Sequence, residues 1–441
     1  MELNKGKTMK RILFLILFLA LIFTVNAQEK ITITLINEGR STYTGFPQWA
    51  KDNSYGFENA DAKIAQAFEM LNPGVRIEMS QMDSATGTAI TFDAALAAGR
   101  PPDIIESAEG KVAKVITPEW AIEVGKYVDL SDYTKLGLAP VTKNGKVLGL
   151  PMSISSSAPT WNMDMLDKIG YRFPSLDKWT TDEFLSLARK LKAKGHYVTA
   201  LFFKNQSSDM WWMNWFYAFG ARQYAPNDYT KSTLNTPAAL KALKFMKQLV
   251  DEGLVVPNPG EIDDDMALDM WAKGQIAMLS MQIGHTVIVG SYVEQKIIPK
   301  QFKITMTEFP HAIGLQHTPV YTGPSLVIGH KGTNEYKNKM IAKFMEVYTG
   351  FERQWMSGSQ NFPTRQSVID VLKDSAHYLF PVQIKIISEA GVIDRGSHLP
   401  VFMKTRAAMF PLMQDYMIGK MTAENVLKNY EKTINDILSG K

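Results

Sequence analysis

Lys143-Asn-Gly-Lys-Val-Leu-Gly-Leu-Pro-Met-Ser-Ile-Ser-Ser-Ser-Ala-Pro-Thr-Trp-Asn162 is the stretch that decides how the chain is divided. Asn144-Gly145 predicts a turn, because both residues tolerate positive φ. The apolar run that follows is expected to stop at Pro151, since proline cannot donate a hydrogen bond within a central strand. The serines at 153 and 155–157 then predict a crossover between two lobes, where small side chains permit closure and hydroxyls accompany unpaired backbone. This stretch alone leaves an ordinary surface loop as the alternative.

The first 27 residues have the pattern of a secretory signal peptide. Basic residues at 5, 7, 10 and 11 precede an apolar run from Ile12 to Val25, and Val25-Asn-Ala27 supplies the small residues of a cleavage site. The run is shorter than the roughly 20 residues that a membrane-spanning helix needs. We therefore expect residues 28–441 to be exported as a soluble, periplasmic or extracytoplasmic protein, with the true start at Met1 or Met9 left open.

Composition excludes several classes of function. The chain has no cysteine, which rules out disulfides, thiol catalysis and a lipid anchor on cysteine. Without residues 1–27 the charge falls from +4 to about +1, which argues against nucleic acid or an acidic membrane surface as a partner. The seven histidines lack metal-ligand spacing and the chain lacks a phosphate-binding P-loop motif, so we expect no metal and no cofactor.

Hydrophobic periodicity predicts alternating strands and helices before the crossover. Strands are expected at 31–36, 75–79 and 103–105, with helices at 61–71 and 92–98 between them. This order is typical of a parallel sheet with helices on both faces.

The remainder of the chain is predicted to be mostly helical. The expected helices are 180–191, opened by a Thr180–Glu183 capping box, 237–249, 263–272 and 423–438. The expected extended segments are 276–281, 302–309 and 326–328. The fold class is therefore α/β, with two lobes, each a mostly parallel sheet flanked by helices, and three crossings between them. We expect one lobe to comprise 28–153 with 310–330, and the other 154–309 with 331–441.

Several sequence stretches, in order along the chain, resemble those of a known family. They are Phe68-Glu-Met-Leu-Asn-Pro-Gly-Val75, Ala97-Ala-Gly-Arg-Pro-Pro-Asp-Ile-Ile105, Lys146-Val-Leu-Gly-Leu-Pro151, Trp271-Ala-Lys-Gly-Gln-Ile-Ala-Met278, Asn361-Phe-Pro-Thr-Arg365 and Gly419-Lys-Met-Thr422. Together they make residues 30–438 similar to the extracellular solute-binding proteins of ABC importers, in the carbohydrate branch. The resemblance implies a monomeric periplasmic-binding-protein clamp, not an enzyme. Such a clamp closes on a sugar and delivers it to membrane permease subunits with a separate ATPase.

The resemblance also implies an aromatic sugar platform within Met210-Trp-Trp-Met-Asn-Trp-Phe-Tyr217. Flat rings match the C–H faces of sugars. We expect Trp211 and Trp212 to be platforms and Trp215 to pack internally, while an ordinary core helix stays the alternative for each tryptophan.

Polar groups for sugar hydroxyls are expected after the predicted strands and near the crossings. These candidates are Glu38, Arg40, Asp83, Ser107, Glu109, Ser155, Gly284, His285, Tyr321 and Arg365. Because guanidinium groups match carboxylates, Arg40 and Arg365 leave a sugar acid open as the ligand. For each candidate, a solvated loop side chain or a structural residue is the alternative.

Two other functions stay open. The same clamp could take a polyamine or a peptide. A secreted carbohydrate hydrolase would need two carboxyl groups roughly 5–10 Å apart, and Asp263-Asp264-Asp265 or Glu38 with Glu109 could supply them.

Overall fold

The chain divides into two units by its internal contacts. The structure, a computed structural model, describes residues 30–38, 57–82, 87–176, 178–205, 209–226, 228–350, 361–373, 379–393 and 395–440. One unit comprises Met1–Ile105 with Gly329–Tyr348, and the other Glu106–Ile328 with Thr349–Lys441. The division at 329 lies beside the predicted crossing near 330, whereas the predicted lobe boundaries at 153 and 310 fall inside the larger unit and stay a prediction. The predicted signal peptide, Arg40 and Asp83 lie outside the described residues.

The smaller unit contains the predicted parallel sheet. β1 (Ile31–Glu38) pairs in parallel with β2 (Val75–Met82) and with β3 (Ile104–Ala108). Helix α2 (Phe57–Leu71) packs on α12 (Glu335–Tyr348), and α3 (Gly87–Ala97) precedes β3. The sequence predicted this parallel arrangement correctly.

Buried contacts hold α2 against α12. The Phe68 and Phe344 rings meet edge to face with centroids 5.1 Å apart, and Tyr348 Oη donates to the buried Asp61 carboxylate at 3.2 Å. Gly74, at φ +98°, makes the turn from α2 into β2. A side chain there would be strained, which explains the helix-stopping Asn-Pro-Gly sequence.

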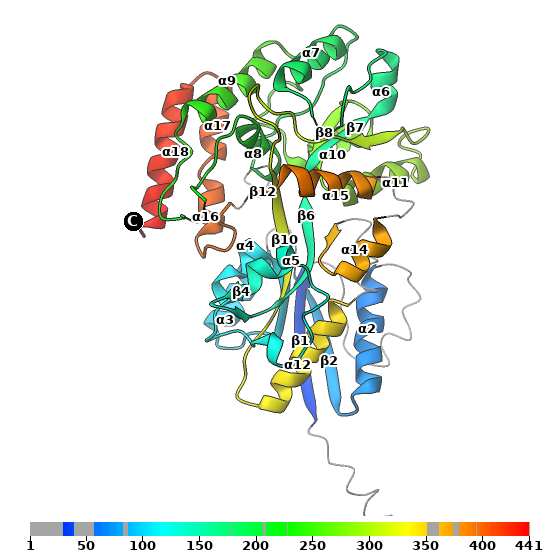
Figure 1. The fold of residues 1–441 in the computed structure, drawn as a ribbon, viewed down its shortest axis with the longest axis vertical. Helices are drawn as coiled ribbons and strands as arrows, with labels where there is room; N and C mark the ends of the chain where they lie inside the picture. The colour runs from blue at the N-terminus through cyan, green and yellow to red at the C-terminus, as the bar shows by residue number, and fades with distance from the viewer. Residues whose placement is uncertain are drawn as a thin grey trace, which may run out of the picture. The chain divides into compact units, whose positions relative to one another are not determined.

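In the larger unit, one extended segment supplies a strand to each of two sheets. β6 (Leu150–Ser156) lies between β10 (Val320–Gly329) and β11 (Phe362–Pro363), antiparallel to both. β7 (Ala158–Asn162) lies between β8 (Met278–Met281) and β9 (Ile304–Met306), again antiparallel to both. Figure 1 shows β6 and β7 following each other along the chain. The pairs that this segment makes are therefore antiparallel, unlike those of β1.

Pro151 does not end the strand, contrary to prediction. It lies within β6 opposite Leu326, where the register shifts between Ser325 and Leu326. At such an irregularity in the strand pairing, a residue without an N–H donor is tolerated, so proline does not have to end the strand. The Thr364 hydroxyl donates to the Pro151 carbonyl at 2.9 Å. The serines at 153, 155 and 156 belong to β6 rather than to a loop.

The predicted turn at Asn144-Gly145 is confirmed. It joins β4 (Thr142–Lys143) to β5 (Lys146–Val147), with φ of 50° at Asn144 and 75° at Gly145. Two successive positive φ values are characteristic of the tight turns that suit a two-residue hairpin loop.

Helices cover the rest of the larger unit. The longer ones are α7 (Thr181–Lys192), α8 (Asp209–Ala218), α9 (Pro237–Asp251), α10 (Asp264–Ala272), α15 (Leu379–Ala390) and α18 (Ala423–Leu438). The shorter ones are α4 (Glu109–Val112), α5 (Lys135–Leu138), α6 (Met163–Lys168), α11 (Ile288–Glu294), α14 (Gln366–Leu372), α16 (Phe402–Ala407) and α17 (Phe410–Met417), and β12 (Val392–Ile393) pairs with β10. The capping box at Thr180 and Glu183 is present as predicted. In Figure 1, α18 lies beside α17 and α9, with which it packs.

The core of this unit is rich in aromatic rings. Trp161 is fully buried, with its ring centroid 5.6 Å from that of Trp179 and 5.0 Å from that of Phe173. Its Nε1 donates to the Thr307 hydroxyl at 3.0 Å. Trp161 therefore packs internally.

Candidate ligand-binding site

A cavity of about 300 Å³ lies within the larger unit. Its walls come from α4, α5, the 3₁₀ helix Ala139–Val141 that follows α5, β4, β6, β10, β12 and the segment after β12. The lining residues are Glu109, Leu136, Ala139, Pro140, Lys143, Ile154, Pro324, Val392, Ile393, Ser397 and His398. The parallel pairing of Val320 with Val392 and of Tyr321 with Ile393 brings the segment after β12 to this wall. The lining combines aliphatic surface with a carboxylate, an ammonium group, a hydroxyl and an imidazole, as expected of a site for a small polar molecule.

The polar wall joins α4 to the segment after β12. The carboxylate of Glu109 is buried, with 5% of the residue exposed, and it accepts a hydrogen bond from the Ser397 hydroxyl. A Cβ at Gly110 would lie 2.2 Å from the Phe402 ring, so only glycine lets α4 approach α16 this closely. These contacts fix the position of Glu109 in the wall.

A buried ion cluster lies next to this wall. Asp209, at the start of α8, accepts hydrogen bonds from Arg395 Nη2 and, at 2.6 Å, from Arg406 Nη2. The side chains of Asp209 and Arg395 are only 2% and 3% exposed. Burial alone would raise the pKa of Asp209, but the two guanidinium groups outweigh it and hold the pKa below its ordinary value. Asp209 is thus a carboxylate shared by two arginines.

Arg395 has N–H groups that donate to no acceptor among the described residues. Its Cζ lies 4.8 Å from the centre of the Tyr321 ring, a cation–π contact that covers one face of the guanidinium. Within the described residues, its Nε and Nη1 are buried without a hydrogen-bond partner, and so is the Tyr217 hydroxyl. Buried polar atoms normally find partners, so this cluster can accept a further ligand or solvent atom.

Of the residues predicted from the sequence, Glu109 lines the cavity and Tyr321 stacks on Arg395 beside it. Ser107 is buried in β3 without lining the cavity, and the Ser155 backbone pairs with Gly323 inside β6. Glu38 ends β1 in the smaller unit. The side chains of Glu38 and Ser155, and any side-chain environment at Gly284, lie outside what the structure describes.

The predicted aromatic platform lies at a different place. Trp211 and Trp212 are 7% and 2% exposed and line a separate void of about 20 Å³. That void has room for about one water molecule. Trp212 Nε1 and Ser280 Oγ, which border it, have no hydrogen-bond partner among the described residues. The structure therefore does not bring these rings to the larger cavity.

His285 stacks on Trp211. The two rings are nearly parallel, at 5° with centroids 5.6 Å apart. Burial lowers the pKa of His285 below its ordinary value and outweighs the negative charges of Asp264 and Asp265, which raise it. The ring is therefore neutral at neutral pH and can pair with an aromatic face.

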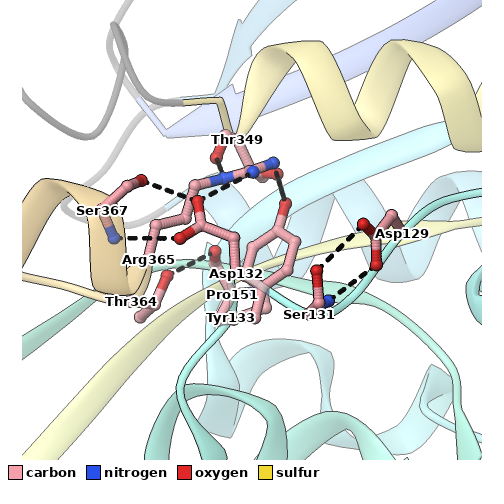
Figure 2. Close-up of polar contacts among 9 residues, drawn as sticks. All are labelled: Asp129, Ser131, Asp132, Tyr133, Pro151, Thr349, Thr364, Arg365 and Ser367. Carbon is pink, nitrogen blue, oxygen red and sulfur yellow. Dashed lines mark hydrogen bonds and ion pairs between the residues drawn. The ribbon is translucent and has the colours of Figure 1, made fainter.

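Arg365 is held by protein partners, as Figure 2 shows. Its Nε donates to the Thr349 carbonyl at 2.8 Å and its Nη2 to the Tyr133 hydroxyl at 2.7 Å. Its Cζ lies 4.2 Å from the centre of the Tyr133 ring. Asp132 lies 3.4 Å from Nη1 and also accepts the backbone N–H and hydroxyl of Ser367 at the start of α14. This network joins the loop before α5 to α14.

The Arg365→Gln variant should therefore lose stability without losing ligand affinity. Removing hydrogen bonds from a charged group is expected to lower the free energy of unfolding by about 1.5–3 kcal/mol. Urea denaturation measures the stability and calorimetric titration the affinity. The matched control Arg172→Gln removes an exposed ion pair with Asp167 and should change stability by less than about 1 kcal/mol. A weaker affinity with unchanged stability would instead support the predicted ligand contact.

The sequence did not identify Lys143, Asp209, Arg395, Ser397, His398 or Arg406 as site residues. A signal existed in Asp394-Arg-Gly-Ser-His398, a polar run directly after the short apolar pair Val392-Ile393. Nothing in that run indicates that it meets Glu109, because Ser397 and Glu109 are 288 residues apart along the chain.

Among the described residues, no group of three or more histidine, cysteine, aspartate or glutamate side chains could hold a metal ion. None of their helices is both long enough and apolar enough to cross a membrane.

Comparison with known proteins identifies the family. Residues 52–350 match the family model of the bacterial extracellular solute-binding proteins. A binding protein of Brucella abortus (strain 2308) is 26% identical over 232 residues, which cover 49% of this chain and 53% of that protein. The chain thus spans about half the length of the curated relatives it matches.

Solved structures share the fold. An ABC substrate-binding protein of Listeria monocytogenes in complex with cycloalternan has a TM-score of 0.69 at 17% identity, covering 93% of this chain and 100% of that one. An ABC transporter solute-binding protein of Thermotoga lettingae bound with α-D-tagatose has a TM-score of 0.71 at 20% identity, covering 92% and 99%. These likenesses confirm the predicted fold class, that of the two-lobed α/β periplasmic-binding proteins. The chain belongs to the family of bacterial extracellular solute-binding proteins.

Proposed function

We propose that this protein is a non-enzymatic receptor that binds a sugar outside the cytoplasm and delivers it to the permease subunits of an ABC importer. Family membership supports the receptor role. The solved structures that share its fold include complexes with cycloalternan and with α-D-tagatose, which supports a sugar as the ligand.

The composition of the cavity wall carries the proposal. Glu109 and Lys143 come from the predicted N-terminal lobe, and Ser397 and His398 from the predicted C-terminal lobe. A ligand that touches both groups would favour the closed form over the open one, which is how a clamp couples binding to closure. Shifting a two-state clamp from 1:99 to 99:1 needs about 5.5 kcal/mol of differential binding, so contacts from both lobes are required.

The wall suits a sugar in chemical terms. Ile154, Pro324 and Ile393 offer aliphatic surface for the C–H faces of a ring, and Glu109 and Ser397 offer an acceptor and a hydroxyl for its rim. We propose Glu109 as a direct ligand contact. Ligand roles for the following residues remain predictions from the sequence: Glu38, Arg40, Asp83, Ser107, Ser155, Trp211, Gly284, His285 and Tyr321. For Trp212 and Arg365, which the sequence also predicts as ligand contacts, we propose structural roles instead, and the variants Trp212→Ala and Arg365→Gln decide between the two roles.

A thermal-shift screen tests the function. We expect one class of sugar to raise the melting temperature, because a ligand at 1,000 times its Kd adds about 4 kcal/mol to stability. The panel comprises neutral mono- and oligosaccharides, uronates, polyols, polyamines and peptides. A response to polyamines or peptides alone would contradict the sugar proposal while keeping the clamp.

The same samples address catalysis and closure. Chromatography of the bound sugar after prolonged incubation should recover it intact, and cleavage would favour the hydrolase instead. Small-angle scattering should show a smaller radius of gyration with ligand than without it, since closure compacts a two-lobed protein.

A further inference from the structure

The charged groups at the cavity and in the ion cluster beside it do not balance. The cavity wall carries Glu109 and Lys143. The cluster carries Arg395 and Arg406 against the single carboxylate of Asp209. Among the described residues named here, three are cationic and two anionic, and the Asp209 cluster is buried where solvent screens charge poorly.

The two anions are already engaged by the protein. Asp209 accepts hydrogen bonds from both guanidinium groups, through both of its carboxylate oxygens. Glu109 accepts the Ser397 hydroxyl. Neither carboxylate makes a hydrogen bond to Nε or Nη1 of Arg395, which have no partner among the described residues.

The neighbouring phenols cannot supply the missing charge. Burial raises the pKa of Tyr321 to about 12, even though Arg395 and Arg406 act in the opposite direction. Burial likewise raises the pKa of Tyr217 well above its ordinary value. Both rings are therefore neutral at physiological pH, and the excess positive charge is not cancelled by ionised tyrosine.

Arg395 does not itself line the cavity, but its near neighbours in the chain do. Ile393 and Ser397, two residues to either side of it, both line the cavity. Tyr321 covers a face of its guanidinium, so acceptors approach along the edge that carries the N–H groups. Phe402, beside Arg395, is covered by Gly110 of α4, the element that also supplies Glu109 to the wall.

We propose that the cavity recognises an acidic sugar, a uronate or an oligosaccharide that contains one, through the positive charge of Arg395 and Lys143. Guanidinium and ammonium groups form short, charge-assisted hydrogen bonds with carboxylates. The ring of such a sugar still finds aliphatic surface at Ile393 and Pro324. This inference rests on the proposed function, because it names the class of sugar that the receptor takes.

Matched pairs of sugars test the inference on the full chain. Galacturonate and glucuronate, with their dimers and trimers, are titrated calorimetrically against galactose, glucose and the corresponding neutral oligomers. We expect the best acidic ligand to bind at least about tenfold more tightly than its neutral match, a difference of about 1.4 kcal/mol. Raising the salt concentration should narrow that difference, because ions screen charge–charge attraction.

Variants assign the effect to the residues. Lys143→Gln and Arg395→Gln should each reduce the acid-to-neutral affinity ratio at least about threefold while affecting the neutral sugar less. The matched control is Lys146→Gln on the neighbouring strand, whose ammonium is exposed and pairs with Glu123 at 3.8 Å. Arg395→Lys, which keeps the charge, provides a second variant if Arg395→Gln does not fold, and it should retain part of the ratio. The ratio is the readout because a loss of stability alone weakens both ligands equally.

The outcomes separate this inference from the proposed function. Binding of neutral sugars as tightly as of their acidic matches would overturn the inference and leave the receptor for sugars standing. Binding of neither kind of sugar would overturn both. A preference for acids that survives both Lys143→Gln and a folded Arg395 variant would show that other residues recognise the carboxylate, and would overturn the assignment.

Discussion

Replacing Asp209 with asparagine will lower the free energy of unfolding by about 3–5 kcal/mol. The substitution keeps the shape of the side chain but removes the negative charge between Arg395 and Arg406. Two guanidinium groups, one with 3% and the other with 13% of its side chain exposed, then face each other without a counter-charge. Breaking a buried pair in this way costs far more than its formation contributes, since the remaining charges stay desolvated.

Urea denaturation at neutral pH measures this loss. The matched control is Asp436→Asn, which removes an exposed ion pair with Lys432 one turn away in α18 and should cost only about 0.3–0.5 kcal/mol. Equal losses in the two variants would show that the Asp209 cluster contributes no more than a surface pair.

The same carboxylate makes the stability depend on acid. The pKa of Asp209 in the folded protein lies below the ordinary 3.8. Between the folded-state pKa and 3.8, the unfolded chain therefore binds more protons at this residue than the folded one. The contribution of Asp209 to the free energy of unfolding is complete above pH 3.8 and is lost as the pH falls through the folded-state pKa. The Asp209→Asn variant should lack this part of the acid-induced loss, which denaturation curves at pH 6 down to pH 3 will detect.

Replacing Trp212 with alanine will also cost about 3–5 kcal/mol of stability, because it empties a large volume in the core. Trp212 is 2% exposed, and its ring centroid lies 5.6 Å from that of Phe203 and 6.2 Å from that of Phe216. We expect the folded fraction of this variant to bind sugar with an unchanged Kd, since the ring does not line the larger cavity.

The affinity of the Trp212→Ala variant separates a core role from the predicted platform. A Kd raised at least about tenfold, or 1.4 kcal/mol, would support direct stacking on the sugar. Trp120→Ala, at a partly exposed tryptophan outside that aromatic cluster, is the matched control for loss of an indole ring.

The elements that the sequence predicts well are those with local signals. Residues close together in the sequence determine the alternation of β1, α2 and β2. They also determine the capping box of α7. Pro151 failed as a strand-ending signal because the deciding feature is a register shift on β10, a strand about 170 residues further along the chain.

The candidate site shows the same limit. Glu109 could be predicted because side chains just after a strand of a parallel sheet tend to meet a ligand. Ser397 and His398 reach the same cavity, and Arg395 the cluster beside it, through the pairing of β10 with β12, which no local pattern encodes. A run of tryptophans likewise fits a core as well as a sugar platform, because both need large rings at helical spacing.

The continuous segment of β6 and β7 has a consequence for the order of folding. Its hydrogen-bonding neighbours are β8, β9, β10 and β11, which begin at residues 278, 304, 320 and 362. A nascent chain released as far as residue 270 would hold this segment with both of its edges unpaired. Contacts between segments so far apart in sequence form slowly, because the entropic cost of closing the long loop comes before the contact can stabilise the fold. The larger unit therefore has to remain incompletely folded until most of the chain is available.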